Sequence, residues 1–99
     1  MRTPADHVER KGKRLSVGLP SRVRHAGDRD AAAEIANISF YGLRATSGAD
    51  LSRGEFISVA LPTVGLVRAR VAWAHGGAFG AVFLRPVDVR SFLLPPRAG

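Results

Sequence analysis

The chain has 99 residues, enough for one modest hydrophobic core, and is expected to form a single domain. It contains no cysteine, which excludes disulfides, thiolate metal sites and a cysteine nucleophile. Lys and Arg total 15 against 8 Asp and Glu, and the resulting formal charge of +7 predicts an anionic partner. The first apolar run starts at Leu15 and is broken at Gly18, so neither a signal peptide nor a membrane span is expected and a cytoplasmic location is predicted.

Residues 1–14 are polar and basic, with too little apolar surface to offset the entropy of ordering, and are expected to form a flexible N-terminal arm. The arm contains the sequence Arg10-Lys11-Gly12-Lys13-Arg14, an R-x-x-x-R pattern. Two guanidinium groups at this spacing can hold different parts of one nucleotide through charge-assisted hydrogen bonds. Taken alone, such a pattern is more often a solvated run of charge.

Alternation of apolar and polar residues predicts a series of short strands after the arm. The first starts at Leu15, with a bend or interruption near Gly18 to Pro20. The others are expected within residues 31–39, 43–46, 55–61, 64–75 and 79–85. Alanines at the start of the second would suit a helix, but the alternation that follows favours a strand. Five or six antiparallel strands of this length are typical of a small barrel or sandwich.

The longest of these segments ends at Gly76-Gly77, a two-residue hairpin turn by composition. Its alternation predicts that Trp73 faces inward while Arg68 and Arg70 face outward. The aromatic residues of the strands are expected in the core, which argues against a surface for single-stranded nucleic acid. These residues are Phe56, Trp73, Phe79 and Phe83. After Pro86, residues 87–94 are predicted to form a short helix that Pro95-Pro96 ends.

A second motif, Asn37-Ile38-Ser39-Phe40-Tyr41-Gly42, has the pattern N-x-S-x-x-G. A period of two places Asn37 and Ser39 side by side on one strand face, where an amide and a hydroxyl can reach one ligand. Gly42 would allow a close backbone approach or a positive φ. The Tyr41 ring could flank a ligand or cover the barrel mouth. Alone, this motif mostly marks a strand end and turn, but the order of the two motifs, with residues 15–36 between them, favours a joint site.

In this order the two motifs resemble the signatures of the PilZ domain family, bacterial receptors for cyclic di-GMP, from Glu9 to about Leu94. The resemblance implies an all-β, six-stranded antiparallel barrel over residues 15–95, with the flexible arm before it and a short helix at its C-terminal end. It also implies that Arg10 and Arg14 contact guanine and phosphate, with Lys11 and Lys13 as further candidates. Asn37, Ser39 and Gly42 would form the wall on the strand side, with Tyr41 as an additional candidate.

Asn37 stands where Asp is more frequent in the family, and its amide carbonyl can accept one guanine N–H. We therefore expect weaker affinity than with a carboxylate at this position. The resemblance predicts a receptor that passes its signal to an unidentified downstream protein, with cyclic di-GMP as a ligand and no cofactor. The alternative is a PilZ-like adaptor that acts through protein contacts without binding nucleotide. A nucleic-acid-binding barrel is a weaker third interpretation.

No catalytic group is expected, since neither a Ser-His-Asp set nor a pair of catalytic carboxylates can be assembled from the sequence. The acids Asp28, Asp30 and Glu34 cluster around a predicted turn, where solvated carboxylates are ordinary. His7, His25 and His75 lack the spacing of metal ligands. The sequence therefore predicts a protein that is not an enzyme and holds no metal.

Overall fold

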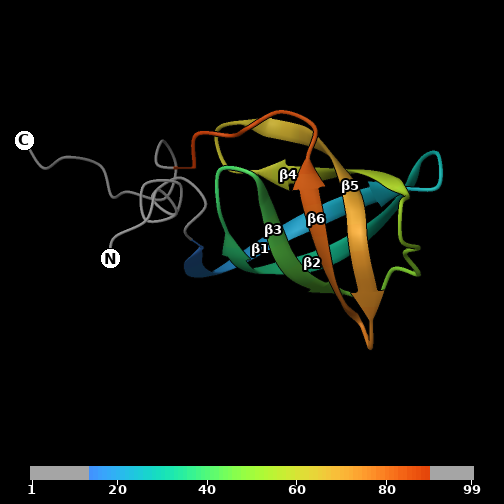
Figure 1. Ribbon diagram of the computed structural model, residues 1–99. Helices are drawn as coiled ribbons and strands as arrows, with labels where there is room; N and C mark the ends of the chain where they lie inside the picture. Colours follow the sequence, from blue (N-terminus) through green and yellow to red (C-terminus); the bar gives the residue numbers. More distant parts are fainter. Residues whose placement is uncertain (1–13, 90–99) are drawn as a thin grey trace, which may run out of the picture.

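A computed structural model describes residues 14–89 of the chain, and within them it shows six strands. The strands are β1 (Leu15–His25), β2 (Arg29–Ile38), β3 (Gly42–Ser47), β4 (Phe56–Leu61), β5 (Gly65–His75) and β6 (Ala78–Phe83). They close into an antiparallel barrel in the order β1-β2-β3-β6-β5-β4 (Figure 1). The predicted all-β, six-stranded antiparallel barrel is confirmed, and the segment with the alanine run is a strand.

After β6 the chain crosses one end of the barrel instead of forming a helix at once. Residues 87–89 are not helical, and both Val87 and Val89 are buried. The Val87 N–H donates to the Phe40 carbonyl at 2.8 Å, which ties this segment to the β2–β3 turn. Residues 1–13 and 90–99 lie outside the described part, and with them the rest of the predicted helix and nearly all of the predicted arm. Within residues 14–89 the structure contains no helix that could cross a membrane.

The two-residue turn between β5 and β6 forms where the sequence predicts it. Gly76 and Gly77 have φ values of 60° and 82°, in the left-handed region that favours glycine. The turn fixes the register of the hairpin, with His75 opposite Ala78. Every later partner along β5 and β6 follows from this pairing until a bulge intervenes.

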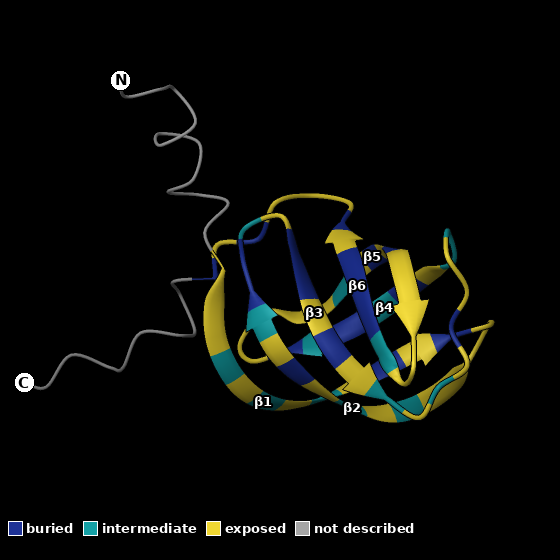
Figure 2. Ribbon diagram, turned by 60° about the horizontal axis from the view of Figure 1, so that its bottom comes forward, coloured by how far each residue is buried: buried dark blue, intermediate teal, exposed yellow. Residues whose placement is uncertain are grey.

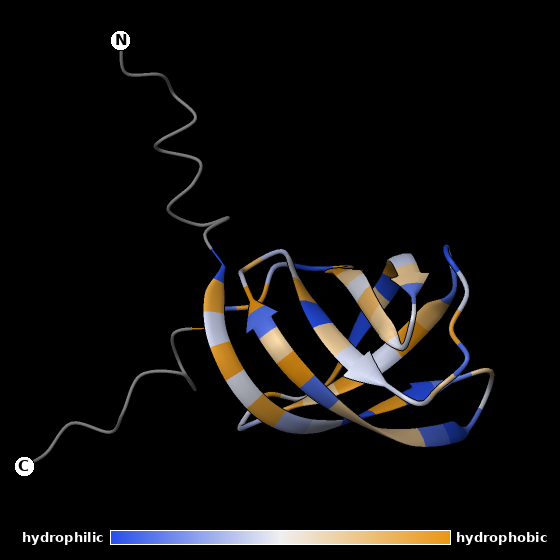
Figure 3. Cartoon of the chain, turned by 90° about the horizontal axis from the view of Figure 1, so that it is seen from below, coloured by the Kyte–Doolittle hydropathy of each residue, from blue (hydrophilic) through white to orange (hydrophobic). Residues whose placement is uncertain are grey.

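One hydrophobic core fills the barrel, because each strand turns alternate residues inward (Figure 2). The largest fully buried side chains come from all strands and from the segment after β6. They are Phe79, Ile35, Ile38, Leu43, Ile57, Val23, Val59, Val71 and Val89. The alternating hydropathy along β1 can be followed in Figure 3. The outer face stays free to carry a site.

Two β-bulges change which residues face the core. In β2, Ile35 pairs with Ala45 and Asn37 with Arg44, so Ala36 is an extra residue. Because of this bulge Ile35 and Ile38 are both fully buried, whereas simple alternation placed them on opposite faces. The predicted facing of this segment is therefore wrong beyond Ala36.

The second bulge, in β5, turns Trp73 outward. Val71 pairs with Ala81 and Trp73 with Gly80, which makes Ala72 the extra residue. The side chain of Trp73 is consequently on the outer face and is 40% exposed, so its predicted core position is wrong. Phe56 is also exposed, at 53%, while the other two strand aromatics, Phe79 and Phe83, are buried as predicted. Two of the four aromatic residues expected in the core therefore lie on the outer surface of the barrel.

Candidate functional site

The two sequence motifs meet at a hydrogen bond. Arg14 Nη1 donates to Asn37 Oδ1 at 2.9 Å, so the second arginine of R-x-x-x-R touches the first residue of N-x-S-x-x-G. The contact follows from the pairing of β1 with β2, in which Ser16 lies opposite Asn37. The Arg14 side chain is exposed and that of Asn37 is half-buried. Arg10, Lys11 and Lys13 lie outside the described residues, so their predicted roles stay predictions.

Ser39 lies in the turn after β2. The strand ends at Ile38, and the Ser39 side chain is buried, so Ser39 and Asn37 are not neighbours on one strand face as the alternation predicted. The Ser39 hydroxyl accepts a hydrogen bond from the Tyr41 N–H at 3.2 Å, and the Ser39 N–H donates to the Gly42 carbonyl at 2.8 Å. These hydrogen bonds from and to Ser39 stabilise the β2–β3 turn, which carries the second motif.

Gly42 starts β3 at a point where two backbones come very close. A Cβ on Gly42 would collide with the Ala81 carbonyl oxygen of β6 and would lie 3.3 Å from the Val82 Cα. The φ of Gly42 is outside the left-handed region, so a positive φ is not found, and the close approach that the missing side chain allows is to the backbone of β6. Tyr41, just before it, is 43% exposed at the edge of the motif, and its carbonyl accepts the Phe83 N–H at 2.8 Å.

Further polar side chains extend the motif contact across the outer face of the barrel. Arg44 lies opposite Asn37 on β3, Gly80 lies opposite Arg44 on β6, and Trp73 lies opposite Gly80 on β5. The Arg44 guanidinium carbon is 5.7 Å from the centre of the Trp73 ring, a cation–π contact. We call Arg14, Asn37, Arg44 and Trp73 the outer row.

The indole of Trp73 can lie flat against β6 only because residue 80 is glycine. A Cβ at Gly80 would overlap the Trp73 ring, with Cε2 at 2.7 Å and Cδ1 at 2.9 Å. Gly80 is consequently buried although it points to the outer face. The glycine, the ring and the guanidinium above it form a layered platform beside Asn37.

The charge of the outer row is cationic. Within residues 14–89, neither Arg14 nor Arg44 forms an ion pair with a carboxylate. Guanidinium groups supply planar, bidentate donors to phosphate or to a base edge, and the indole supplies an apolar face. No group of three or more metal-ligating His, Asp or Glu side chains occurs in the same part of the chain. The row therefore has the chemistry of a surface that binds a planar anion.

Sequence reasoning missed Arg44 and Trp73 as site residues. The signal that could have found them is the Gly76–Gly77 turn, since counting outward from it places Trp73 opposite Gly80 and on the face away from Phe79. Once Trp73 is on that face, the cross-strand partner of Gly80 on its other side is Arg44. Strict alternation along β5 hides this arrangement because it makes no allowance for a bulge.

The fold and the outer row define a class of protein: a small closed antiparallel barrel with a cationic binding surface on its outside. Comparison with family models identifies the family. The PilZ domain model matches residues 9–93, and the chain belongs to this family. PilZ domains typically bind cyclic di-GMP and are generally receptors without catalytic activity. No sequence among the curated proteins matches the chain.

Proposed function

We propose that this protein is a cyclic di-GMP receptor that holds its ligand between the R-x-x-x-R segment and the outer end of β2. One observation carries the proposal: Arg14 and Asn37, one from each motif, are joined by a hydrogen bond of 2.9 Å. The family supports the ligand, and the cationic charge of the outer row suits a molecule with two phosphates.

The Arg14–Asn37 hydrogen bond leaves most of the binding capacity of both side chains unused. The guanidinium has five N–H donors, of which this bond engages one, and Asn37 retains its amide N–H groups and one acceptor position. In the proposal, Arg14 donates to a phosphate or to the guanine edge, and Asn37 accepts from a guanine N–H. Arg10 approaches from the other side, with Lys11 and Lys13 adding positive charge.

Ser39 and Gly42 act through the shape of the β2–β3 turn. The Ser39 hydroxyl is bonded to the Tyr41 N–H, and Gly42 permits the contact with β6. Loss of either group therefore disturbs the position of Asn37 and of the exposed Tyr41 ring. In the proposal Arg44 and Trp73 form the far edge of the site, where the Arg44 guanidinium that lies over the indole is available to a guanine base or a phosphate.

The output in this proposal is closure of residues 1–14 over the bound ligand, which creates a new surface for a downstream protein. Ordering such a segment offsets on the order of 2–5 kcal/mol of the contact energy, so we expect micromolar affinity or somewhat better. Slower amide exchange along residues 5–14 on ligand addition would support closure. Unchanged exchange in a saturated complex would refute closure and leave binding intact.

Calorimetric titration with cyclic di-GMP tests the binding itself. We expect saturable heat with the unmodified protein, loss of binding in Arg14→Ala and in Arg10→Ala, and weaker binding in Ser39→Ala. Arg29→Ala is the matched control, because Arg29 is an exposed arginine at the start of β2, far along the strand from Asn37. Absence of heat with the unmodified protein would contradict the proposal and favour the alternative, an adaptor that acts through protein contacts alone.

A further inference from the structure

A second outward-facing surface lies on the β4–β5–β6 side of the barrel and belongs to neither motif. Three apolar side chains on it are about half exposed: Phe56 at 53%, Val82 at 52% and Leu84 at 51%. Phe56 lies opposite Arg70, and Arg70 lies opposite Val82, so these side chains form one continuous row. Exposed apolar side chains gathered on one sheet face are typical of an interaction site.

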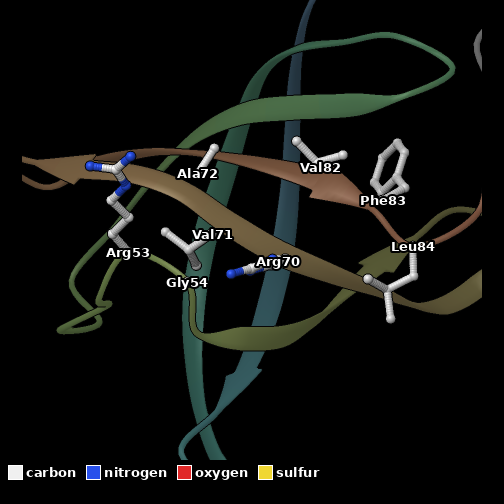
Figure 4. A pocket seen from close by; sticks show the side chains of 8 residues that line it. All are labelled: Arg53, Gly54, Arg70, Val71, Ala72, Val82, Phe83 and Leu84. Carbon is white, nitrogen blue, oxygen red and sulfur yellow. The ribbon is translucent and has the colours of Figure 1, made fainter.

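An open groove of about 540 Å³ lies beside this row, and Arg70 and Val82 belong to both. Figure 4 shows the side chains that line the groove. Arg53 closes one end of the groove, Leu84 lies at the other, and Arg70 and Val82 line it between them. We call Phe56, Arg53, Arg70, Val82 and Leu84 the second surface. It is separate from the outer row, with which it shares no residue.

Backbone hydrogen bonds hold the groove in shape. The Gly54 N–H donates to the Val71 carbonyl at 2.7 Å, and the Val71 N–H donates to the Glu55 carbonyl at 2.9 Å. These bonds fasten the loop that carries Arg53 to β5. Gly54 has a φ of 88°, which allows the loop to turn beside the Arg70 guanidinium. The groove is therefore a preformed feature of the barrel.

The second surface carries positive charge without a neutralising partner. Within residues 14–89, Arg53 and Arg70 form no ion pair, and no lining residue of the groove is acidic. The nearest acid in sequence, Glu55, is engaged elsewhere: its Oε1 accepts the Ser52 N–H at 2.9 Å and its Oε2 lies 3.7 Å from His25 Nδ1. Arg70 is held over the Phe56 ring, with 5.9 Å between guanidinium carbon and ring centre.

We propose that the second surface docks an acidic segment of a partner protein that presents carboxylates beside aliphatic side chains. Its two guanidiniums would pair with the carboxylates, and Val82 and Leu84 would contact the aliphatic groups. The surface complements this chemistry, and neither terminal segment is acidic: residues 90–99 contain two Arg and no acid, and residues 1–13 hold more basic than acidic side chains. This interaction goes beyond cyclic di-GMP binding and does not depend on it.

Two other occupants fit the charges and shapes less well. A second copy of the chain would bring Arg53 and Arg70 against one another across a symmetric interface, in a protein of formal charge +7. Single-stranded nucleic acid binds through open aromatic faces, whereas Arg70 already lies over Phe56 and the remaining apolar groups are aliphatic.

The test is an NMR titration of the ¹⁵N-labelled full chain, without cyclic di-GMP, with a capped pentapeptide of alternating glutamate and leucine. We expect saturable shifts of the Phe56, Arg70, Val82 and Leu84 amides, with affinity of roughly millimolar order for so short a probe. Peptides with glutamine for glutamate, or glycine for leucine, should bind at least about fivefold more weakly, since each removes one half of the complementarity.

Arg70→Glu and Leu84→Ser should each weaken peptide binding by about tenfold while the remaining amide spectrum stays that of the folded barrel. Arg29→Glu is the control, because it makes the same change of charge at an exposed arginine of β2. Each of the following results would overturn the proposal: no saturable shifts at these amides, equal binding of the glutamine peptide, equal loss in Arg29→Glu, or stronger shifts of the same amides with a thymidine oligonucleotide. Shifts that grow with protein concentration without peptide would assign the surface to a second copy instead.

Discussion

At the scale of single residues, Gly42 acts through the absence of a side chain. A Cβ there would collide with the Ala81 carbonyl oxygen, which is backbone in the middle of β6 and cannot rotate away. We expect Gly42→Ala to lower the free energy of unfolding by about 1–3 kcal/mol, the usual cost of forcing extra volume into a packed region. Urea denaturation followed by circular dichroism measures it.

Gly48→Ala is the control for this prediction. A Cβ at Gly48 would meet no atom within 4 Å, and its φ lies outside the left-handed region. That variant should therefore unfold at the same urea concentration as the unmodified protein or slightly above it. Equal unfolding midpoints for Gly42→Ala and Gly48→Ala would show that β3 and β6 can move apart without loss of stability, so that Gly42 is not needed for their close packing.

Gly80 also acts through the absence of a side chain, but the group that it leaves room for is a side chain and not a backbone. Its missing Cβ leaves room for the Trp73 indole, which lies over it below Arg44. In Gly80→Ala we expect the indole to be displaced into solvent, with emission shifted to longer wavelength; Trp73 is the only tryptophan of the chain and the sole source of this signal. An unchanged emission spectrum would mean that the ring does not rest on β6, and Gly48→Ala again serves as the control.

At the scale of elements, the sequence predicts the strands well and their faces less well. The positions of all six strands and the Gly76–Gly77 turn follow from alternation and turn composition, because both are local properties. Ala36 and Ala72 show the limit. Each is an extra residue in a strand of a curved barrel, and each reverses the facing of everything beyond it.

The same limit explains which part of the candidate site was predictable. Arg14 and Asn37 lie in recognisable motifs, and the β1–β2 pairing brings them together as the order of the motifs suggested. Arg44 and Trp73 join them only through pairings across β3, β6 and β5, that is, through contacts between residues distant in sequence. Ser39 is predicted on a strand face but lies in a turn, because β2 ends at Ile38, one residue before the predicted end of the strand.

The β1–β4 seam is the least paired junction of the barrel. Only Val23 with Val59 and Arg24 with Ser58 are paired there, whereas β5 and β6 pair along most of their length. A side-chain hydrogen bond supplements the seam: Ser21 Oγ donates to the Ala60 carbonyl at 2.6 Å. The seam is therefore the place where the barrel should open first.

Removing that hydroxyl should weaken the seam selectively. We expect Ser21→Ala to cost about 1 kcal/mol and to speed amide exchange in β4 more than in β6, since the loss falls at one junction. Native-state hydrogen exchange of the two strands provides the comparison. Ser58→Ala is the matched control, a serine at the same seam whose hydroxyl has no hydrogen bond to residues 14–89. If amide exchange became faster by the same factor in β4 and in β6 in both variants, the β1–β4 seam would not be a distinct weak junction.

At the scale of the whole molecule, the barrel holds two cationic surfaces in a fixed relation. The outer row and the second surface lie on the same closed sheet, and Val82 of the second surface lies opposite Gly42 of the second motif. A single core supports both, so neither surface can shift without disturbing the packing beneath it. Ligand and partner protein would therefore bind to neighbouring faces of one rigid scaffold.

The net charge of +7 then predicts how strongly ligand binding depends on salt. Cyclic di-GMP carries two negative charges, and Arg14 and Arg44, which are proposed to meet it, are exposed, so their attraction is screened within about 10 Å at 0.1 M ionic strength. We expect affinity to fall by about tenfold between low and high sodium chloride, mainly through slower association. Titrations followed by Trp73 emission measure this, and Lys13→Ala should show a smaller dependence on salt because one of the screened charges is gone while both arginines of the motif remain. Affinity that stays constant across the series would indicate that stacking and neutral hydrogen bonds, and not the arginines, hold the ligand.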